Sequence, residues 1–113
     1  MKFKSFKHAF KGIVDGIKNE TNFRVMVISF LLVLILNLFF KVTRMEWVIT
    51  LLCSGVVLSS ELLNSALEST LDVYSKEHHI LIKNAKDFAA GAVLIMSVIS
   101  FVIAMLIYMP YFL

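Results

Sequence analysis

The chain begins with an amphipathic pattern of apolar and basic residues. Apolar side chains recur at helical spacing near its start, at Phe3, Phe6, Phe10, Ile13 and Ile17. Lysines and one aspartate take most of the positions between them. A basic amphipathic helix with aromatic anchors is typical of the membrane interface. The pattern therefore predicts an interfacial helix over about 3–20, and a soluble helix packed against a partner is the alternative.

Three long apolar runs follow this first segment. Residues 25–40 and 88–113 contain no charged side chain, and a third uncharged run, 47–60, continues into a helix with one polar face. A transmembrane helix needs about 20 predominantly apolar residues. We therefore predict an all-α membrane protein with three transmembrane helices and an N-terminal interfacial helix. The expected spans are about 23–41, 46–72 and 86–110, within a single membrane-embedded domain, 1–113.

The composition supports a membrane location and argues against a nucleic-acid-binding or disulfide-bonded protein. Hydrophobic residues make up 59% of the 113 residues, whereas soluble domains usually have about 45–50%. The net charge of +3 is too small to indicate a nucleic-acid partner. Cys53 is the single cysteine, so no disulfide is expected within the chain. The first residues lack the apolar core of a secretory signal, and we expect none.

The distribution of basic residues predicts the orientation in the cell membrane. Lysines are frequent before the first span, and the segment 73–87 adds further lysines. The opposite side carries only Lys41 and Arg44. Loops rich in Lys and Arg stay in the cytoplasm. We therefore expect the N-terminus and the 73–87 loop to be cytoplasmic and the C-terminus to lie outside.

The clearest candidate for chemistry is the segment E-L-L-N-S-A-L-E-S-T-L-D at 61–72. At 100° per residue one helix face carries Glu61, Asn64, Ser65, Glu68 and Asp72. Glu61 and Glu68 are separated by two turns, or roughly 10.5 Å. A carboxylate within a membrane costs roughly 2.5 kcal/mol or more, so such a residue indicates a functional site. The alternative is a solvated face in the cytoplasm.

Two further segments place charges on the same side of the membrane. Glu20 lies in N-E-T-N-F-R, 19–24, just before the first span. Carboxylates facing each other from two helices suggest Mg²⁺, which prefers oxygen ligands and phosphate. Pairing of Glu20 with Arg24 is the alternative. Lys86, in K-N-A-K-D-F-A-A-G, 83–91, is placed to hold a phosphate or simply to reach the interface.

Several familiar motifs are missing from the sequence. It contains neither the glycine-rich phosphate loop G-x-x-x-x-G-K-[ST] nor the set of protein-kinase motifs. The adjacent His78 and His79 lack the further ligands that a zinc site needs. ATP, if it is used, would be held by acids, Mg²⁺ and a few basic groups.

These motifs, in this order, resemble the small bacterial diacylglycerol kinase family. E-L-L-N-S-A-L-E matches its specific signature, N-E-T-N-F-R resembles its first acidic motif, and E-H-H followed by A-K-D resembles its nucleotide loop. The resemblance covers about 5–110. It implies a homotrimer with active sites between subunits. His8 and His78 depart from the family pattern, so no nucleotide contact is carried over to them.

The resemblance also implies roles for individual residues. It implies that Glu61 is the general base and that Glu20 and Glu68 bind Mg²⁺. The residues that would support the nucleotide and its phosphates are Asn64, Glu77, His79, Lys86 and Asp87. We further expect the lipid acceptor to contact Arg24, Glu61 and Ser65. ATP is then the phosphoryl donor.

The sequence indicates the type of reaction more clearly than it indicates which lipid accepts the phosphoryl group. F-K-H-A-F-K-G-I at 6–13 and N-E-T-N-F-R resemble the Gram-positive branch of the family, whose members are similar to undecaprenol kinases. Undecaprenol is therefore the expected acceptor, with diacylglycerol as the alternative. A small proton-coupled transporter or a non-enzymatic membrane partner is the rival from another class, because a transporter also needs an intramembrane acid.

Overall fold

The computed structural model describes residues 3–74 and 79–113. Within these ranges the chain is helical, and no strand is present. The helices are α1 (Phe3–Asn19), α2 (Thr21–Phe40), α3 (Arg44–Tyr74) and α4 (Ile80–Phe112). The predicted all-α architecture, with three long apolar helices and an N-terminal helix, is confirmed.

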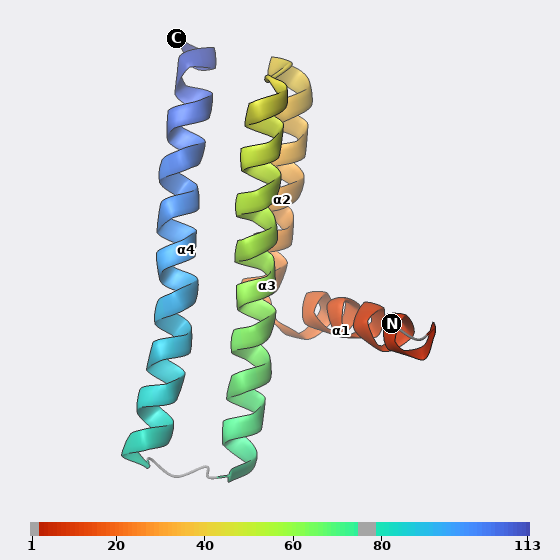
Figure 1. Ribbon diagram of the computed structural model, residues 1–113, viewed down its shortest axis with the longest axis vertical. Coiled ribbons are helices and arrows are strands. Elements are labelled where there is room, and N and C mark those ends of the chain that lie inside the picture. The colour runs from red at the N-terminus through yellow and green to blue at the C-terminus, as the bar shows by residue number, and fades with distance from the viewer. Residues whose placement is uncertain (1–2, 75–78) are drawn as a thin grey trace.

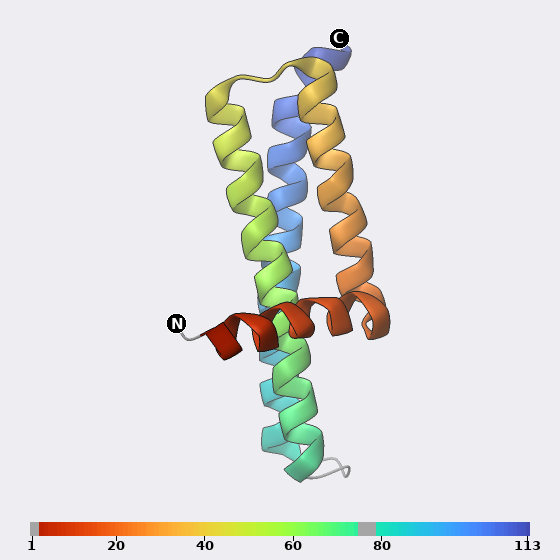
Figure 2. The same ribbon diagram turned by 90° about the vertical axis from the view of Figure 1, so that its right-hand side faces the viewer.

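The three long helices run side by side, and α1 projects sideways from them (Figure 1). The bundle has two ends. At the α3–α4 end, the chain passes from α3 into α4; at the C-terminal end, it passes from α2 into α3 and α4 terminates. Figure 2 shows α1 crossing in front of α3, with parts of α3 and α4 extending beyond it toward the α3–α4 end. An interfacial helix marks the membrane surface, so these extensions would project out of the bilayer.

Most of the apolar surface of the bundle faces outward. All three long helices have the length and hydropathy needed to cross a membrane, and only 11% of the most apolar window of each is buried within the chain. Water cannot be the solvent of so large an apolar surface, because exposed apolar patches on soluble monomers rarely exceed a few hundred Å². The protein is therefore a membrane protein.

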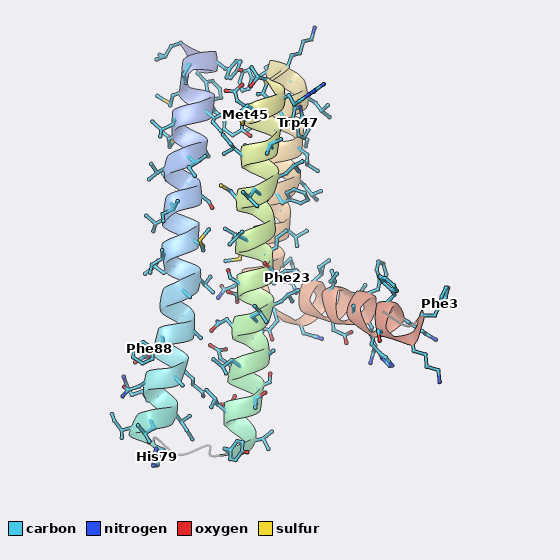
Figure 3. All side chains as sticks on the ribbon, in the orientation of Figure 1. Phe3, Phe23, Met45, Trp47, His79 and Phe88 are labelled. Atoms are coloured by element: carbon cyan, nitrogen blue, oxygen red, sulfur yellow. The ribbon has the colours of Figure 1, made fainter. Side chains whose placement is uncertain are left out.

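A capping box begins α3 at the C-terminal end. The Thr43 backbone N–H donates to Glu46 Oε1 at 2.9 Å, and the Glu46 N–H donates to Thr43 Oγ1 at 3.2 Å. This reciprocal pair satisfies backbone donors that the first helical turn leaves free. The Tyr111 hydroxyl donates to the same Glu46 carboxylate and so joins α4 to the start of α3. Met45 and Trp47 lie at this end of the bundle in Figure 3.

A buried polar network joins the three long helices one turn deeper. Asn37 Nδ2 donates to Thr50 Oγ1 at 2.9 Å, and the Tyr108 hydroxyl donates to Asn37 Oδ1 at 2.6 Å. Thr50 Oγ1 donates in turn to the Glu46 carbonyl at 2.8 Å. Asn37 is completely buried. Buried polar groups must be hydrogen-bonded to be tolerated, and here each partner comes from a different helix.

The predicted loop at 73–87 is wrong over most of its length. Helix α3 continues to Tyr74 and α4 already begins at Ile80. His79 caps α4, because its Nδ1 accepts the Leu81 N–H at 3.2 Å. Lys83 and Asp87 then form an ion pair one turn apart, at 2.8 Å. The charged residues mark the exit from hydrocarbon, but the helix itself continues beyond it.

Candidate active site

The polar stripe of α3 passes from a buried to an exposed environment. Glu61 and Asn64 are only 4% and 9% exposed. Ser65 is half-buried, whereas Glu68 and Asp72 are exposed. The alternative of a fully solvated face is therefore wrong for the first part of the stripe. Neither a hydrogen bond nor an ion pair to the Glu61 side chain is present within residues 3–74 and 79–113, and over the same ranges Asn64 Oδ1 is buried without a partner.

Helix α1 meets α3 beside Glu61. A Cβ atom on Gly16 would lie 2.9 Å from Leu62 Cδ2 and 3.0 Å from Phe23 Cδ2. A larger residue at this position would therefore require the Leu62 and Phe23 side chains to shift, so glycine favours the close approach of α1 to α3. Phe23 is 2% exposed and lies at the junction of α1 with the bundle in Figure 3. The buried acid thus lies at the level of the interfacial helix.

The corner between α1 and α2 carries Glu20. This residue is extended, with φ −110° and ψ 108°, and its side chain caps neither helix. The corner is held by Arg24, whose Nε donates to the Ile17 carbonyl at 2.9 Å and whose Nη2 donates to the Lys18 carbonyl at 2.7 Å. Arg24 therefore binds the free carbonyls at the end of α1, a position that favours cations.

The alternative pairing of Glu20 with Arg24 is not formed. Among the described residues the ion pairs are Lys83–Asp87 and Lys86–Asp72. The Glu20 carboxylate therefore remains available. Glu20 and Glu68 are also the two carboxylates whose charges act on Glu61. Glu20 at the start of α2 and Glu61 and Glu68 on α3 thus belong to neighbouring helices, and no direct contact joins their carboxylates within the described residues.

The basic groups lie on the extension beyond α1. Lys86 Nζ contacts Asp72 Oδ1, which joins α4 to the last turns of the stripe. Both side chains remain partly exposed, at 36% and 55%. Asp87 binds Lys83, and His79 caps α4 through Nδ1, which leaves its Nε2 free of that contact. Glu77 and His78 lie outside the described residues.

The acids do not form a closed metal cage on their own. No group of three His, Cys, Asp or Glu side chains suited to a metal occurs in the part of the chain that the structure describes. Mg²⁺ usually keeps several waters and binds through one or two carboxylates plus substrate phosphates. Two acids with the unpaired Asn64 oxygen nearby fit an ion that arrives with a nucleotide. They do not fit a permanently bound structural metal.

Two contributors to this site were not predicted. Gly16 follows Ile13 by three residues and so lies on the apolar face of α1, and a glycine on such a face could have indicated a close helix contact. The capping role of Arg24 had a weaker signal, because a cation one turn after a helix end has several common uses.

Comparison with known proteins identifies the family of the chain. A family model described as prokaryotic diacylglycerol kinase matches residues 7–108. The chain belongs to this family. It is therefore a lipid kinase that uses ATP, and family membership favours this reading over the transporter alternative.

Relatives within the lipid kinase family differ in the acceptor that they are named for. The chain is 44% identical to the undecaprenol kinase of Bacillus subtilis over 108 residues, covering 96% of this chain and 88% of the relative. It is 36% identical to the diacylglycerol kinase of Helicobacter pylori, with 83% and 79% covered. The diacylglycerol kinase of Escherichia coli is 30% identical, with 86% and 80% covered.

Proposed function

We propose that the protein transfers the γ-phosphoryl group of ATP to the hydroxyl of undecaprenol and phosphorylates diacylglycerol more slowly. The observation that carries the chemistry is the buried Glu61 at the level of the interfacial helix, with no side-chain partner within the described residues. A lipid hydroxyl is found at that depth. The choice of acceptor is supported by the 44% identity to an undecaprenol kinase, against 36% and 30% to diacylglycerol kinases.

Glu61 acts as the general base of this reaction. Its carboxylate accepts the hydroxyl proton while the lipid oxygen forms a bond to the γ-phosphorus. The bond from that phosphorus to the bridging oxygen breaks, and ADP leaves. General-base catalysis of this kind is typically worth about 10²–10⁴-fold. Lys86 supplies positive charge to the phosphates from α4, and Asn64 binds the nucleotide through its buried amide.

Glu20 and Glu68 are the residues that would hold Mg²⁺ together with phosphate oxygens. When bound, the ion neutralises charge on the phosphates. His79 and Asp87 border the nucleotide from the start of α4, and Glu77 belongs to the same proposed set. Arg24 and Ser65 contact the acceptor; the two Arg24 hydrogen bonds to α1 leave three of its five N–H donors free.

The active unit in this proposal is a homotrimer with sites between subunits, built from one domain over 1–113. Gly55 and Ser59 are exposed and four residues apart on α3, and a Cβ on Gly55 would meet nothing within 4 Å. A small-xxx-small pair permits close approach of a neighbouring helix. Cross-linking in mild detergent should give a ladder ending at trimer. A ladder ending at monomer under active conditions would contradict shared sites.

The proposed orientation places α1 and the α3–α4 end in the cytoplasm. Helix α1 carries several lysines and leads into α2 on this side of the spans, and Lys83 and Lys86 lie in the first turns of α4 on the same side, which supports the assignment. A cysteine placed at Lys41, in a Cys53→Ala background, should react with an impermeant reagent added to intact cells. A cysteine at Lys11 should react only after the cells are opened. The reverse pattern would contradict the orientation.

The acceptor is tested by measuring kcat/KM for undecaprenol and diacylglycerol in the same mixed micelles. A site built to hydrogen-bond ester carbonyls rejects lipids that lack them, and beside Glu61 the donors are few. We expect a preference for undecaprenol without exclusion of diacylglycerol. A ratio in favour of diacylglycerol would overturn the acceptor assignment and leave the kinase activity standing.

A further inference from the structure

One ion pair joins α3 to α4 beyond the level of α1. Lys86 Nζ of α4 contacts Asp72 Oδ1 of α3, although the two residues are 14 positions apart. The other ion pair among the described residues, Lys83–Asp87, lies within α4 alone at 2.8 Å. Lys86–Asp72 is therefore the charged contact that connects the two helices where they project from the bilayer (Figure 1).

The proposed reaction uses one member of this pair but not the other. Lys86 supplies positive charge to the phosphates, whereas Asp72 has no part in the reaction. Asp72 follows Glu68 by four residues, so the two carboxylates share one face of α3 with their Cβ atoms about 5–6 Å apart. The Lys86 ammonium thus lies one helical turn from a carboxylate that we propose to hold Mg²⁺.

Glu68 is the next carboxylate that Lys86 could bind. Lysine carries its ammonium on a flexible four-carbon stem, so the side chain can turn from Asp72 toward Glu68. Glu68 is exposed, and within residues 3–74 and 79–113 it takes part in no ion pair. An ammonium bound there would compete with Mg²⁺, because both cations require the carboxylate oxygens.

The part of α4 that faces Glu68 carries no cation of its own. The chain descends α3 and ascends α4, so four residues back along α3 correspond to about four residues forward along α4 (Figure 1). With Lys86 opposite Asp72, Glu68 lies near the level of Ala90. Residues 88–113 contain no charged side chain. Lys86 is therefore the lysine of α4 that lies nearest to Glu68.

We propose that Asp72 is a positioning residue, which binds Lys86 in the resting enzyme and so keeps Glu68 free for Mg²⁺. When ATP arrives with its metal ion, Lys86 moves from Asp72 to the phosphates, which carry more negative charge than one carboxylate. The Lys86 and Asp72 side chains are 36% and 55% exposed, and an ion pair in such surroundings is weak enough to exchange. The inference rests on the proposed function, because it requires Mg²⁺ at Glu68 and phosphate at Lys86.

The first test removes the charge of Asp72. In Asp72→Asn, Lys86 should turn to Glu68, and the Mg²⁺ concentration for half-maximal rate at saturating ATP should rise by roughly two- to fivefold, as expected for an exposed ion pair. At saturating Mg²⁺ the metal displaces Lys86, so the maximal rate should come within about twofold of the wild type. Asp72→Glu retains a carboxylate and should restore the wild-type Mg²⁺ dependence.

The ion pair within α4 provides a matched control. Lys83→Met removes a pair whose side chains are also partly exposed, at 52% and 62%. This pair does not reach α3, so the Mg²⁺ dependence of Lys83→Met should equal that of the wild type. An equal rise in Lys83→Met and Asp72→Asn would show that the loss of any ion pair in this region is sufficient, and would contradict the inference.

The second test asks whether Asp72 acts through Lys86. Asp72→Asn is introduced into Lys86→Met, where no ammonium remains to move to Glu68, and it should then leave metal binding unchanged. Because Lys86→Met is expected to be slow, the probe is Mn²⁺ binding in the presence of the β,γ-imido analogue of ATP, followed by electron paramagnetic resonance. The wild type, both single variants and the double variant are compared.

Three results would contradict the inference. One is an unchanged Mg²⁺ dependence in Asp72→Asn. Another is an equal weakening of Mn²⁺ binding by Asp72→Asn with and without Lys86, which would indicate only a general loss of negative charge. The third is loss of the oligomer in Asp72→Asn, seen by size-exclusion chromatography, which would indicate that the pair holds the helices together. A wild-type rate in Lys86→Met, or a wild-type Mg²⁺ dependence in Glu68→Ala, would instead refute the roles assigned in the proposed function.

Discussion

The two ends of the bundle each bury polar side chains, but they differ in what those side chains bind. At the C-terminal end Asn37, Thr50 and Tyr108 satisfy one another across three helices. Near the α3–α4 end Glu61 and Asn64 are buried to a similar degree, yet Asn64 Oδ1 has no partner within the described residues. A closed network contributes to structure, whereas a polar group that is buried without a partner beside a buried acid is suited to bind a ligand.

The two buried asparagines allow a matched test of this contrast. Asn64→Leu should reduce kcat/KM for ATP by roughly 10–100-fold, because a hydrogen bond to a charged ligand is worth about 1.5–3 kcal/mol. Its stability in detergent should not fall, since it removes a buried group that has no partner within the described residues. Steady-state kinetics and denaturant unfolding on the same preparation measure both quantities. A stable variant with wild-type kinetics would remove Asn64 from the site.

Glu20 and Glu68 test whether the end of the bundle near Glu61 binds Mg²⁺. Glu20→Ala and Glu68→Ala should each raise the Mg²⁺ concentration needed for half-maximal rate by roughly tenfold, as expected when a group supporting a metal is lost. The residues lie on different helices, so a similar effect from both would indicate one shared ion. Titrating Mg²⁺ at fixed ATP measures it. Unchanged Mg²⁺ dependence in both variants would refute a shared metal.

Two glycines of α1 test how the interfacial helix is positioned beside Glu61. Gly16→Ala should cost about 1–3 kcal/mol by overpacking, because its Cβ would lie 2.9 Å from Leu62 Cδ2. Gly12→Ala is the matched control, since a Cβ there meets nothing within 4 Å. Unfolding free energies and rates are compared for both. Leu62→Ala should partly rescue Gly16→Ala, and equal effects at the two glycines would contradict the close contact.

The smallest expected effect lies at the satisfied end. Asn37→Leu leaves the Tyr108 hydroxyl unpaired and should lower the free energy of unfolding by about 0.6–1.7 kcal/mol, the range for hydrogen bonds in membrane proteins. The rate with a short acceptor should remain near that of the wild type. The free energy of unfolding is measured in mixed micelles, and the phosphorylation rate is measured on the same protein. Loss of activity in an Asn37→Leu protein of unchanged stability would contradict a purely structural role for the buried network at the C-terminal end.

The sequence predicted the parts of this protein that follow from local pattern. Uncharged runs identified the three long helices, and the spacing of acids identified the stripe that begins at Glu61. Helix ends beyond the membrane were poorly predicted: charges at Lys83 and Asp87 suggested a loop, although they form an ion pair within α4. Charged residues indicate that a segment is exposed to water, but they do not indicate where the helix ends.

Contacts between distant segments could not be predicted in the same way. Tyr108 and Asn37 are 71 residues apart, and each is an ordinary interface or helix residue when considered alone. The close approach of Gly16 to Leu62 likewise depends on the angle between α1 and the bundle. The capping box T-R-M-E at 43–46 differs from these contacts, because it joins residues only three apart and its spacing is a known sequence signal.

The most direct test of the account compares the wild type with Glu61→Gln at saturating ATP and Mg²⁺. The measurement is the transfer of label from γ-labelled ATP to undecaprenol, with oligomeric state and unfolding free energy recorded on the same samples. The account predicts a loss of about 10²–10⁴-fold in rate with folding and assembly unchanged. A Glu61→Gln protein that retains more than about a tenth of the wild-type rate would contradict the role of Glu61 as base.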